Sequence, residues 1–243
     1  MPHVLVLGGT TEASALCLAL AEAQIPTVLS YMGRVDRPKP QPVAVRIGGF
    51  GGVAGLTDYL RAHHITHLVD ATHPFAAQMS THAVQACHTT GVPLIALTRP
   101  AWQPGPGDRW QRVPDMAAAV AALAGPAQTI MLAIGRMHLA EFAAQPQHHY
   151  LLRLVDAPRE TPPLPHHAVV VDRGPFSADA DRALMQAHGV QRVVSKNAGG
   201  TGSIAKLEAA RALGLPVLMI DRPILPPRRA VHSTAQVLAF IRT

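Results

Sequence analysis

Glycine and hydroxyl residues that follow the first apolar run could bind a phosphate group. They come after residues 4–7 in the order Gly8, Gly9, Thr10, Thr11 and Glu12. Glycine lets the backbone approach a phosphate closely, and the first N–H groups of a helix are donors at the positive end of its dipole. The third glycine of the GxGxxG pattern is absent. A tight turn capped by Thr10 or Thr11 is the alternative interpretation.

The end of the second apolar run indicates which nucleotide would carry that phosphate. A unit that binds NAD usually has Asp or Glu there, about 20 residues after the glycines, to bind the ribose 2′-hydroxyl. This chain has Ser30 and Arg34 instead, and a hydroxyl with a guanidinium suits the 2′-phosphate of NADP. Asp36 lies close enough to leave NAD open as an alternative. The pattern favours NADPH.

Two more polar segments follow apolar runs in the N-terminal half. Gly49 belongs to the glycine-rich stretch 46–52, which either permits close approach of a cofactor or forms an irregular loop. Asp70, Thr72 and His73 follow the fourth apolar run and precede a proline suited to the first turn of a helix. These three could face a ligand. Alternatively, Asp70 caps the helix and His73 faces solvent.

A loop in the C-terminal half could bind an anionic substrate. Lys196 and Asn197 precede a glycine-rich helix entry that includes Gly200 and Thr201. Such a loop can bind carboxylate or phosphate. A flexible surface loop with a solvated lysine would have the same sequence pattern and is the alternative interpretation. Arg136, which also follows an apolar run, could supply another contact to an anion.

The elements that would position these residues alternate between strands and helices. Apolar residues recur at helical spacing between the short runs, as in Ala13, Leu16, Cys17 and Leu20. Strands separated by helices pair in parallel through right-handed crossovers, so we expect an α/β fold with ligands at the carboxyl ends of the strands. The expected strands lie near residues 4–7, 27–29, 43–45, 67–69, 94–97, 129–134, 150–154, 168–171, 193–194 and 217–220.

The Pro- and Gly-rich stretch 103–108 is the clearest linker, and it predicts an N-terminal domain 1–104 and a C-terminal domain 105–243. Residues 91–100 (GVPLIALTRP) align with residues 214–223 (GLPVLMIDRP). The match indicates similar βαβ units in both halves, unless the two segments converged on the same helix-stop and strand pattern. We expect the ligand site in a cleft between the two lobes.

Composition narrows the class of protein. The net charge is +6, and Lys39, Lys196 and Lys206 are the only lysines among 21 basic residues. An arginine-rich surface suits an anionic ligand, although a bias of the source genome would also produce it. Aromatic residues make up 4% of the chain and no basic run occurs, so we expect no nucleic-acid partner. No apolar run approaches the roughly 20 residues that span a bilayer, and a signal-peptide pattern is missing. These features predict a cytoplasmic protein with no membrane partner.

Metal and hydrolase chemistry have little support. Cys17 and Cys87 are far apart and form no CxxC pair, and His63 and His67 have no HExxH pattern around them. The chain also has no GxSxG motif. We therefore expect no metal site, and nothing in the sequence requires more than a monomer.

Five of these segments together resemble the precorrin-6A reductase family of cobalamin biosynthesis. They run in the family's order from residue 8 to residue 200, so the likeness covers nearly the whole chain. The segments are residues 8–13 (GGTTEA), 46–52 (RIGGFGG), 70–76 (DATHPFA), 98–102 (TRPAW) and 195–200 (SKNAGG).

The resemblance implies two Rossmann-like lobes, with parallel sheets flanked by helices and a ligand cleft between them. It implies NADPH-dependent reduction of one double bond in the precorrin-6A macrocycle, a tetrapyrrole, to give precorrin-6B. By that likeness Asp70, Thr72 and His73 lie near the nicotinamide. Lys196, Asn197, Gly200 and Thr201 face the acetate and propionate groups of the substrate. The residues that it assigns to cofactor binding are Gly8, Gly9, Thr10, Thr11, Glu12, Ser30, Arg34 and Gly49.

Hydride transfer needs a proton source, because the neighbouring carbon must be protonated. His73 is the first candidate for a general acid, since an unperturbed imidazole titrates near neutral pH, and Lys196 is the second. Water could also serve. An NADPH reductase of another acidic small molecule, or of the cobalt-containing precorrin, keeps every residue-level observation. A non-catalytic nucleotide-binding regulator is the rival from another class.

Overall fold

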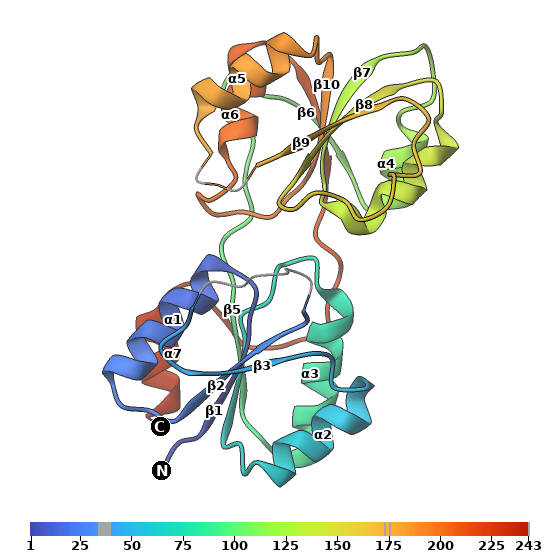
Figure 1. The fold of residues 1–243 in the computed structure, drawn as a ribbon. Helices are drawn as coiled ribbons and strands as arrows, with labels where there is room; N and C mark the ends of the chain where they lie inside the picture. The colour runs from blue at the N-terminus through green and yellow to red at the C-terminus, as the bar shows by residue number, and fades with distance from the viewer. Residues whose placement is uncertain (34–39, 173, 175, 243) are drawn as a thin grey trace. The chain divides into compact units, whose positions relative to one another are not determined.

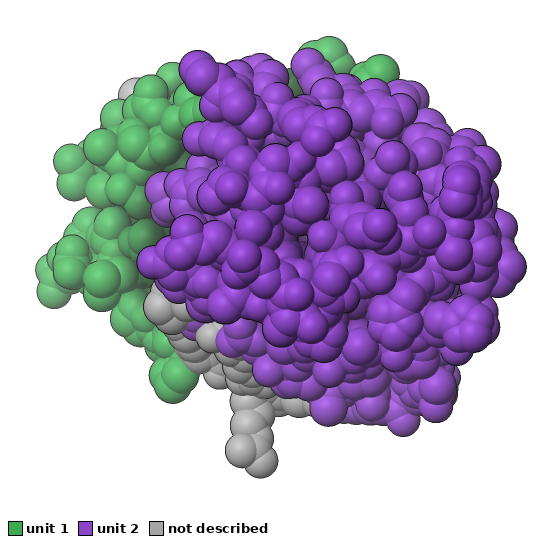
Figure 2. Space-filling model, turned by 90° about the horizontal axis from the view of Figure 1, so that it is seen from above, with its two compact units in different colours: residues 1–100, 224–243 green, residues 101–223 purple. Residues whose placement is uncertain are grey.

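The structure, a computed structural model, describes residues 1–33, 40–172, 174 and 176–242. Arg34 and Asp36, which the sequence analysis singled out, lie outside the described residues. The chain folds into two compact units, coloured separately in Figure 2. Unit 1 contains Met1–Pro100 and Ile224–Thr243, and unit 2 contains Ala101–Pro223. The division expected at residue 104 differs from this, because the chain returns to the first unit after Pro223.

The sheet of unit 1 has six parallel strands. Its order is β12-β5-β4-β1-β2-β3, with β1 (Val4–Leu7) next to β4 and β2 at the centre of the sheet. This is the 3-2-1-4-5-6 order of the dinucleotide-binding α/β fold, read from the other end. The remaining strands are β2 (Thr27–Tyr31), β3 (Ala44–Ile47), β4 (His67–Asp70), β5 (Leu94–Leu97) and β12 (Ala230–Val231).

Helices cover both faces of this sheet (Figure 1). The helices α1 (Thr11–Glu22) and α7 (Thr234–Ile241) pack on the face that includes Val4 and Val6. On the opposite face, α2 (Gly52–Ala62) and α3 (Ala77–Thr90) pack against Leu5 and Leu7. Strands buried on both faces read as continuous apolar runs, which is why β1, β4 and β5 could be recognised from the sequence.

Unit 2 repeats the architecture. Its six strands are all parallel and follow the order β6-β11-β10-β7-β8-β9, the same arrangement as in unit 1. The strands are β6 (Arg109–Val113), β7 (Thr129–Ala133), β8 (His149–Leu154), β9 (His167–Val171), β10 (Arg192–Lys196) and β11 (Pro216–Ile220). The helices are α4 (Met116–Ala121), the 3₁₀ helix η1 (Arg136–Ala144), α5 (Ala178–Ala187) and α6 (Ala205–Ala212). The predicted α/β class with two Rossmann-like parallel sheets is confirmed.

Each sheet receives its sixth strand from a segment next to a crossing between the units. In unit 1 this strand is β12, which follows the return of the chain, and in unit 2 it is β6, which follows the first crossing. Sequence analysis missed both strands and α4. β12 has only two residues, and β6 is polar and largely exposed, so neither produces an apolar run.

The two aligned decapeptides contain β5 and β11, which occupy the same place in their sheets. Each decapeptide ends in Arg-Pro at a crossing, at Pro100 and Pro223. Within the described residues, no helix is long and apolar enough to span a membrane.

Candidate functional site

The loop after β1 has the shape that phosphate binding requires. The Gly8 N–H donates to Ser30 O at 3.0 Å, and a Cβ at Gly8 would lie 2.5 Å from Leu29 Cδ1. No larger residue fits there unless buried Leu29 moves. Gly9 has φ of +114°, a conformation that favours glycine, and nothing lies within 4 Å of where its Cβ would be. The loop is tightly packed on its sheet side and open on its other side.

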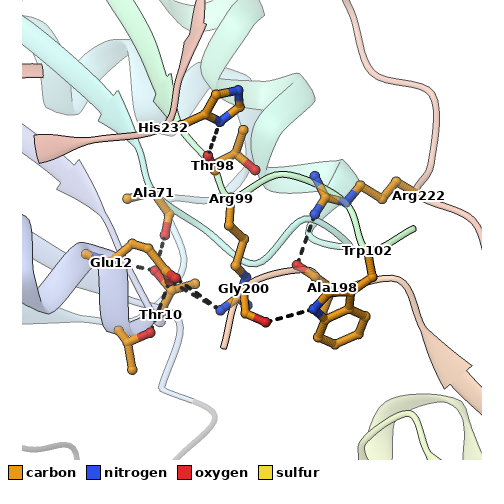
Figure 3. A network of polar contacts seen from close by, with 12 residues as sticks. Thr10, Glu12, Ala71, Thr98, Arg99, Trp102, Ala198, Gly200, Arg222 and His232 are labelled. Atoms are coloured by element: carbon orange, nitrogen blue, oxygen red, sulfur yellow. Dashed lines mark hydrogen bonds and ion pairs between the residues drawn. The ribbon is translucent and has the colours of Figure 1, made fainter. Parts of the chain in front are cut away.

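Thr10 holds this loop in place (Figure 3). Its Oγ1 accepts from the Ala13 N–H at 3.1 Å and donates to Ala71 O at 2.8 Å, so it caps α1 and joins the loop to the end of β4. The capped turn and the phosphate loop are therefore the same structure. The N–H groups of Thr11 and Glu12 start α1 without intrahelical partners and remain available to an anion.

Glu12 does not offer its side chain to a phosphate. Its carboxylate accepts from Thr11 Oγ1 at 3.1 Å and forms an ion pair with Arg99 at 3.3 Å. An uncompensated carboxylate would repel a pyrophosphate at this helix start, and Arg99 neutralises it. The backbone of Glu12 can still bind a cofactor, whereas its side chain binds Arg99.

Ser30 pairs with an arginine that sequence analysis did not select. The Ser30 Oγ accepts from Arg46 Nη1 at 2.9 Å, because Ser30 and Arg46 are register partners on β2 and β3. Arg46 also donates to Gly48 O at 2.8 Å and to Gly49 O at 3.1 Å, and its guanidinium lies 3.8 Å from the centre of the Phe50 ring. A cation is thus held at the carboxyl ends of β2 and β3.

Asp70 forms the centre of a buried network. Its Oδ1 accepts from the Thr72 N–H and from Thr72 Oγ1, at 3.1 and 2.7 Å. Its Oδ2 accepts from Ser80 Oγ at 2.7 Å and pairs with Arg228 at 3.3 Å. The Asp70 side chain is 1% exposed, so it fixes the loop after β4 rather than meeting a ligand. Thr72 is half-buried, but its hydroxyl donates to Asp70.

His73 is half-buried, and its ring has a defined tautomer. Its Nδ1 accepts from the Phe75 N–H at 3.2 Å. In the neutral ring the other nitrogen, Nε2, then carries the proton. The segment 73–76 forms a turn that starts α3 at Ala77, so His73 lies at the carboxyl edge of the sheet as predicted.

In unit 2, β7 occupies the place that β1 has in unit 1, but the loop after β7 differs from the loop after β1. Gly135 follows β7 with φ of +74°, and Arg136 is exposed at the start of η1. A 3₁₀ helix takes the place of α1 here. Lys196 ends β10 and is half-buried, and Thr201 is exposed in the turn that precedes α6.

Both polar atoms of the Asn197 side chain form hydrogen bonds with the backbone of Trp102. Its Oδ1 accepts from the Trp102 N–H at 2.8 Å and its Nδ2 donates to Trp102 O at 3.0 Å. The indole Nε1 of Trp102 donates to Gly200 O at 2.7 Å, and Arg222 donates to Ala198 O (Figure 3). Arg222 also donates to Asn197 O. Asn197 is 4% exposed. The expected contact of its amide with substrate carboxylates is therefore replaced by a positioning role.

Other chemistry finds no support among the described residues. No group of three His, Cys, Asp or Glu side chains lies close enough to hold a metal ion in the part of the chain that the structure describes. Burial raises the pKa of Cys17 to about 11 and that of Cys87 to about 12. Both thiols are therefore protonated and unreactive at neutral pH.

Comparison with known proteins assigns the chain to a family. The model described as "Precorrin-6x reductase CbiJ/CobK" matches residues 3–242. This chain belongs to the precorrin-6x reductase family. The resemblance inferred from five short segments is thereby confirmed, and it extends past residue 200 to the last helix.

Individual members of the precorrin-6x reductase family agree with this assignment. Precorrin-6A reductase from Rhodobacter capsulatus is 56% identical over 99% of this chain and 96% of its own length. Cobalt-precorrin-6A reductase from Priestia megaterium is 32% identical over 90% of each chain. A solved structure named CobK precorrin-6A reductase is 53% identical and covers 100% of this chain and 96% of its own, with a TM-score of 0.95.

Several residues of the site could not be selected from the sequence. Arg46 is part of a strand, and its pairing with Ser30 depends on strand register. Arg99 and Arg228 act through ion pairs with Glu12 and Asp70. Arg46 and Arg99 lie inside segments 46–52 and 98–102, which carry the family resemblance. Nothing in those segments distinguished these two residues from their neighbours.

Proposed function

We propose that this protein uses NADPH to reduce one double bond of the precorrin-6A macrocycle and so gives precorrin-6B. This proposal rests on the loop after β1, whose shape suits a phosphate, in a chain whose residues 3–242 match a reductase family. A net charge of +6 also suits a substrate rich in carboxylates.

The residues around the β1 loop fit a dinucleotide. Gly8 lets the loop pack on Leu29, and Gly9 leaves open space for the pyrophosphate. The N–H groups of Thr11 and Glu12 can donate to it. Arg99 keeps the Glu12 carboxylate from opposing it. When bound, the cofactor supplies a hydride from its dihydronicotinamide ring.

A proton must then reach the carbon next to the one that is reduced. His73 Nε2–H is the donor that fits best, because Phe75 fixes the tautomer and His73 lies at the carboxyl edge of the cofactor-binding unit. Lys196 in unit 2 is the second candidate. The double bond gains one hydride and one proton, the cofactor becomes oxidised, and no other reactant is needed.

Polar groups at the carboxyl edge of the second sheet are suited to substrate carboxylates. Half-buried Lys196 is the last residue of β10, and exposed Arg136 and Thr201 follow β7 and β10. Asn197 and Gly200 support these contacts by fixing the loop to Trp102.

The identities of the relatives favour a substrate without cobalt. Relatives named precorrin-6A reductase are 42 to 56% identical to this chain, as in Rhodobacter capsulatus and Mycobacterium tuberculosis. Relatives named cobalt-precorrin-6A reductase are 25 to 32% identical. We therefore propose the metal-free macrocycle as the substrate.

The test is turnover of purified protein with precorrin-6A and NADPH. We expect one NADPH oxidised for each precorrin-6B formed, and slower turnover of the cobalt-containing precorrin. NADPH binding without oxidation by either macrocycle would identify a regulator or a reductase of another acid, and would contradict the proposal.

A His73→Gln variant tests the proton donor. A general acid contributes roughly 10²- to 10⁴-fold to rate, so kcat should fall by a factor in that range while the Kd of NADPH stays unchanged. Near-normal turnover of this variant would remove His73 from the mechanism and leave Lys196 or water as the proton source.

A further inference from the structure

A buried lysine packs against the loop that joins β10 to α6 in unit 2. Lys206 is the second residue of α6 and is only 3% exposed. Its Nζ donates to Ser203 O at 2.5 Å and lies 4.9 Å from the centre of the Trp102 ring, whose indole donates to Gly200 O. The ammonium group therefore lies against the same loop that carries Thr201 and that we propose to face substrate carboxylates.

The position of Lys206 is unfavourable for a positive charge in two ways. Burial removes water from the ammonium group, and a cation in the first turn of α6 meets the positive end of the helix dipole. An apolar side chain of the same length would pack beside Trp102 without either cost. A charge held at such a place indicates a role beyond packing.

Two other charged side chains share this buried region. Asp181 on α5 and Arg153 on β8 form an ion pair, and their side chains are 3% and 6% exposed. Burial raises the pKa of the Asp181 carboxyl, whereas the positive charges of Arg153 and Lys206 act to lower it. Asp172 also acts on Asp181, but Asp172 is exposed, so water screens its charge. Among the described residues, the buried part of this group has two cations and one carboxylate, which leaves a net positive charge.

We infer that the positive charge of Lys206 strengthens the binding of substrate carboxylates at the loop between β10 and α6. The inference rests on the proposed function, because it concerns how the macrocycle is bound. Lys206 is too buried to contact the substrate, so it is a positioning residue that acts through its field and through the loop. A buried charge acts over a longer range than a surface charge, since less water screens it.

Two variants change the charge of this buried group in opposite directions. Lys206→Met removes one positive charge and keeps the length and the helix propensity of the side chain. Asp181→Asn removes the negative charge and keeps an oxygen that can accept from Arg153. Arg182→Gln is the matched control, because it removes one positive charge from the exposed face of α5, next to Asp181.

The measurement is the KM for precorrin-6A and the kcat of each full-length variant at saturating NADPH. For Lys206→Met we expect KM to rise about 5- to 30-fold while kcat stays within about twofold. For Asp181→Asn we expect KM to fall about two- to fivefold, although this variant loses stability because Arg153 no longer has a charged partner. The control should match the wild type, and the Kd of NADPH should be the same in all four proteins.

Other outcomes overturn the inference in distinguishable ways. If Lys206→Met and Asp181→Asn both raise KM, the buried group only holds the loop in shape. If KM of Lys206→Met stays within twofold of the wild-type value, the charge does not reach the substrate. If Lys206→Met does not fold, Asp181→Asn decides alone, since a KM that rises or stays constant contradicts the inference. A wild type that does not turn over precorrin-6A would contradict the proposed function, and the inference with it.

Discussion

The two units share one strand order, yet the loops after β1 and β7, the corresponding strands of the two sheets, offer different groups to a ligand. In unit 1 two glycines lead into the twelve-residue helix α1, and the Thr10 cap leaves the N–H groups of Thr11 and Glu12 available. In unit 2 the loop has only Gly135 before the exposed Arg136, and a 3₁₀ helix follows. The loop after β1 therefore offers backbone donors to an anion, whereas the loop after β7 carries a side-chain cation. Corresponding places in the two sheets thus hold loops of different chemistry.

The units also differ in the loops after β4 and β10, which are corresponding strands of the two sheets. In unit 1 buried Asp70 gathers hydroxyl groups and Arg228 around the loop that carries His73. In unit 2 the amide of Asn197 bonds both backbone groups of Trp102, at the first crossing of the chain. A charge network fixes one loop and neutral hydrogen bonds fix the other, so the two should respond differently to substitution.

The largest expected effect comes from filling the β1 loop. Gly8→Val brings side-chain atoms against Leu29 on the packed side of the loop, so the loop must shift from the position in which it would hold the pyrophosphate. We expect the Kd of NADPH, measured by fluorescence titration, to rise roughly 100-fold or more, equivalent to about 2.7 kcal/mol.

Gly135→Val in unit 2 is the paired variant. It puts a β-branched residue at positive φ and costs stability, but it should leave the Kd of NADPH within about twofold. If the two variants raise the Kd of NADPH equally, the loops after β1 and β7 do not differ in their contribution to NADPH binding.

Loss of the Asp70 carboxylate should be the largest effect on stability. Asp70→Ala leaves Arg228 without its partner in a mostly buried site. Breaking a buried pair from one side costs about 3–5 kcal/mol, which urea denaturation of the full chain would measure. A loss below about 1 kcal/mol would show that the network does not hold the loop after β4.

Asn197→Ala should reduce the free energy of unfolding by less than Asp70→Ala does. It removes two hydrogen bonds and leaves two buried backbone groups of Trp102 unsatisfied, at a cost of about 2–3 kcal/mol. The KM for the macrocycle should rise while the Kd of NADPH stays constant, because the proposed cofactor site is in unit 1. A matching rise in the Kd of NADPH would contradict this separation of roles.

The smallest effect concerns the entry into β6. Burial alone would raise the pKa of Asp108, but hydrogen bonds from Arg211 and Gly105 outweigh it and lower the pKa below the ordinary value of 3.8. A lowered folded-state pKa contributes stability above pH 3.8 that is lost as the pH falls through the folded value. Asp108→Asn should therefore cost about 1 kcal/mol or less at neutral pH, with the difference disappearing in strong acid. Urea denaturation at several pH values measures the free energy of unfolding of both proteins. If the difference between wild type and Asp108→Asn stays constant with pH, the Asp108 carboxylate is not its source.

Sequence patterns predicted the parts of the molecule that depend on local chemistry. The buried strands follow from apolar runs, and the Thr10 cap follows from a residue type that accepts from helix N–H groups. The role of Asn197 could not be predicted, because its partner Trp102 is 95 residues away. Arg46 was missed because its contacts with Ser30 and Phe50 depend on strand register and on how the Phe50 ring packs. Glycines at strand ends indicated the site, and the side chains that complete it come from distant segments.

The central claim is that unit 1 alone binds the dinucleotide, through the loop after β1. A crystal structure of the chain in complex with NADPH tests it most directly. The account predicts the pyrophosphate within hydrogen-bond distance of the N–H groups of Thr11 and Glu12. A pyrophosphate bound at Gly135 and Arg136 in unit 2 would contradict it.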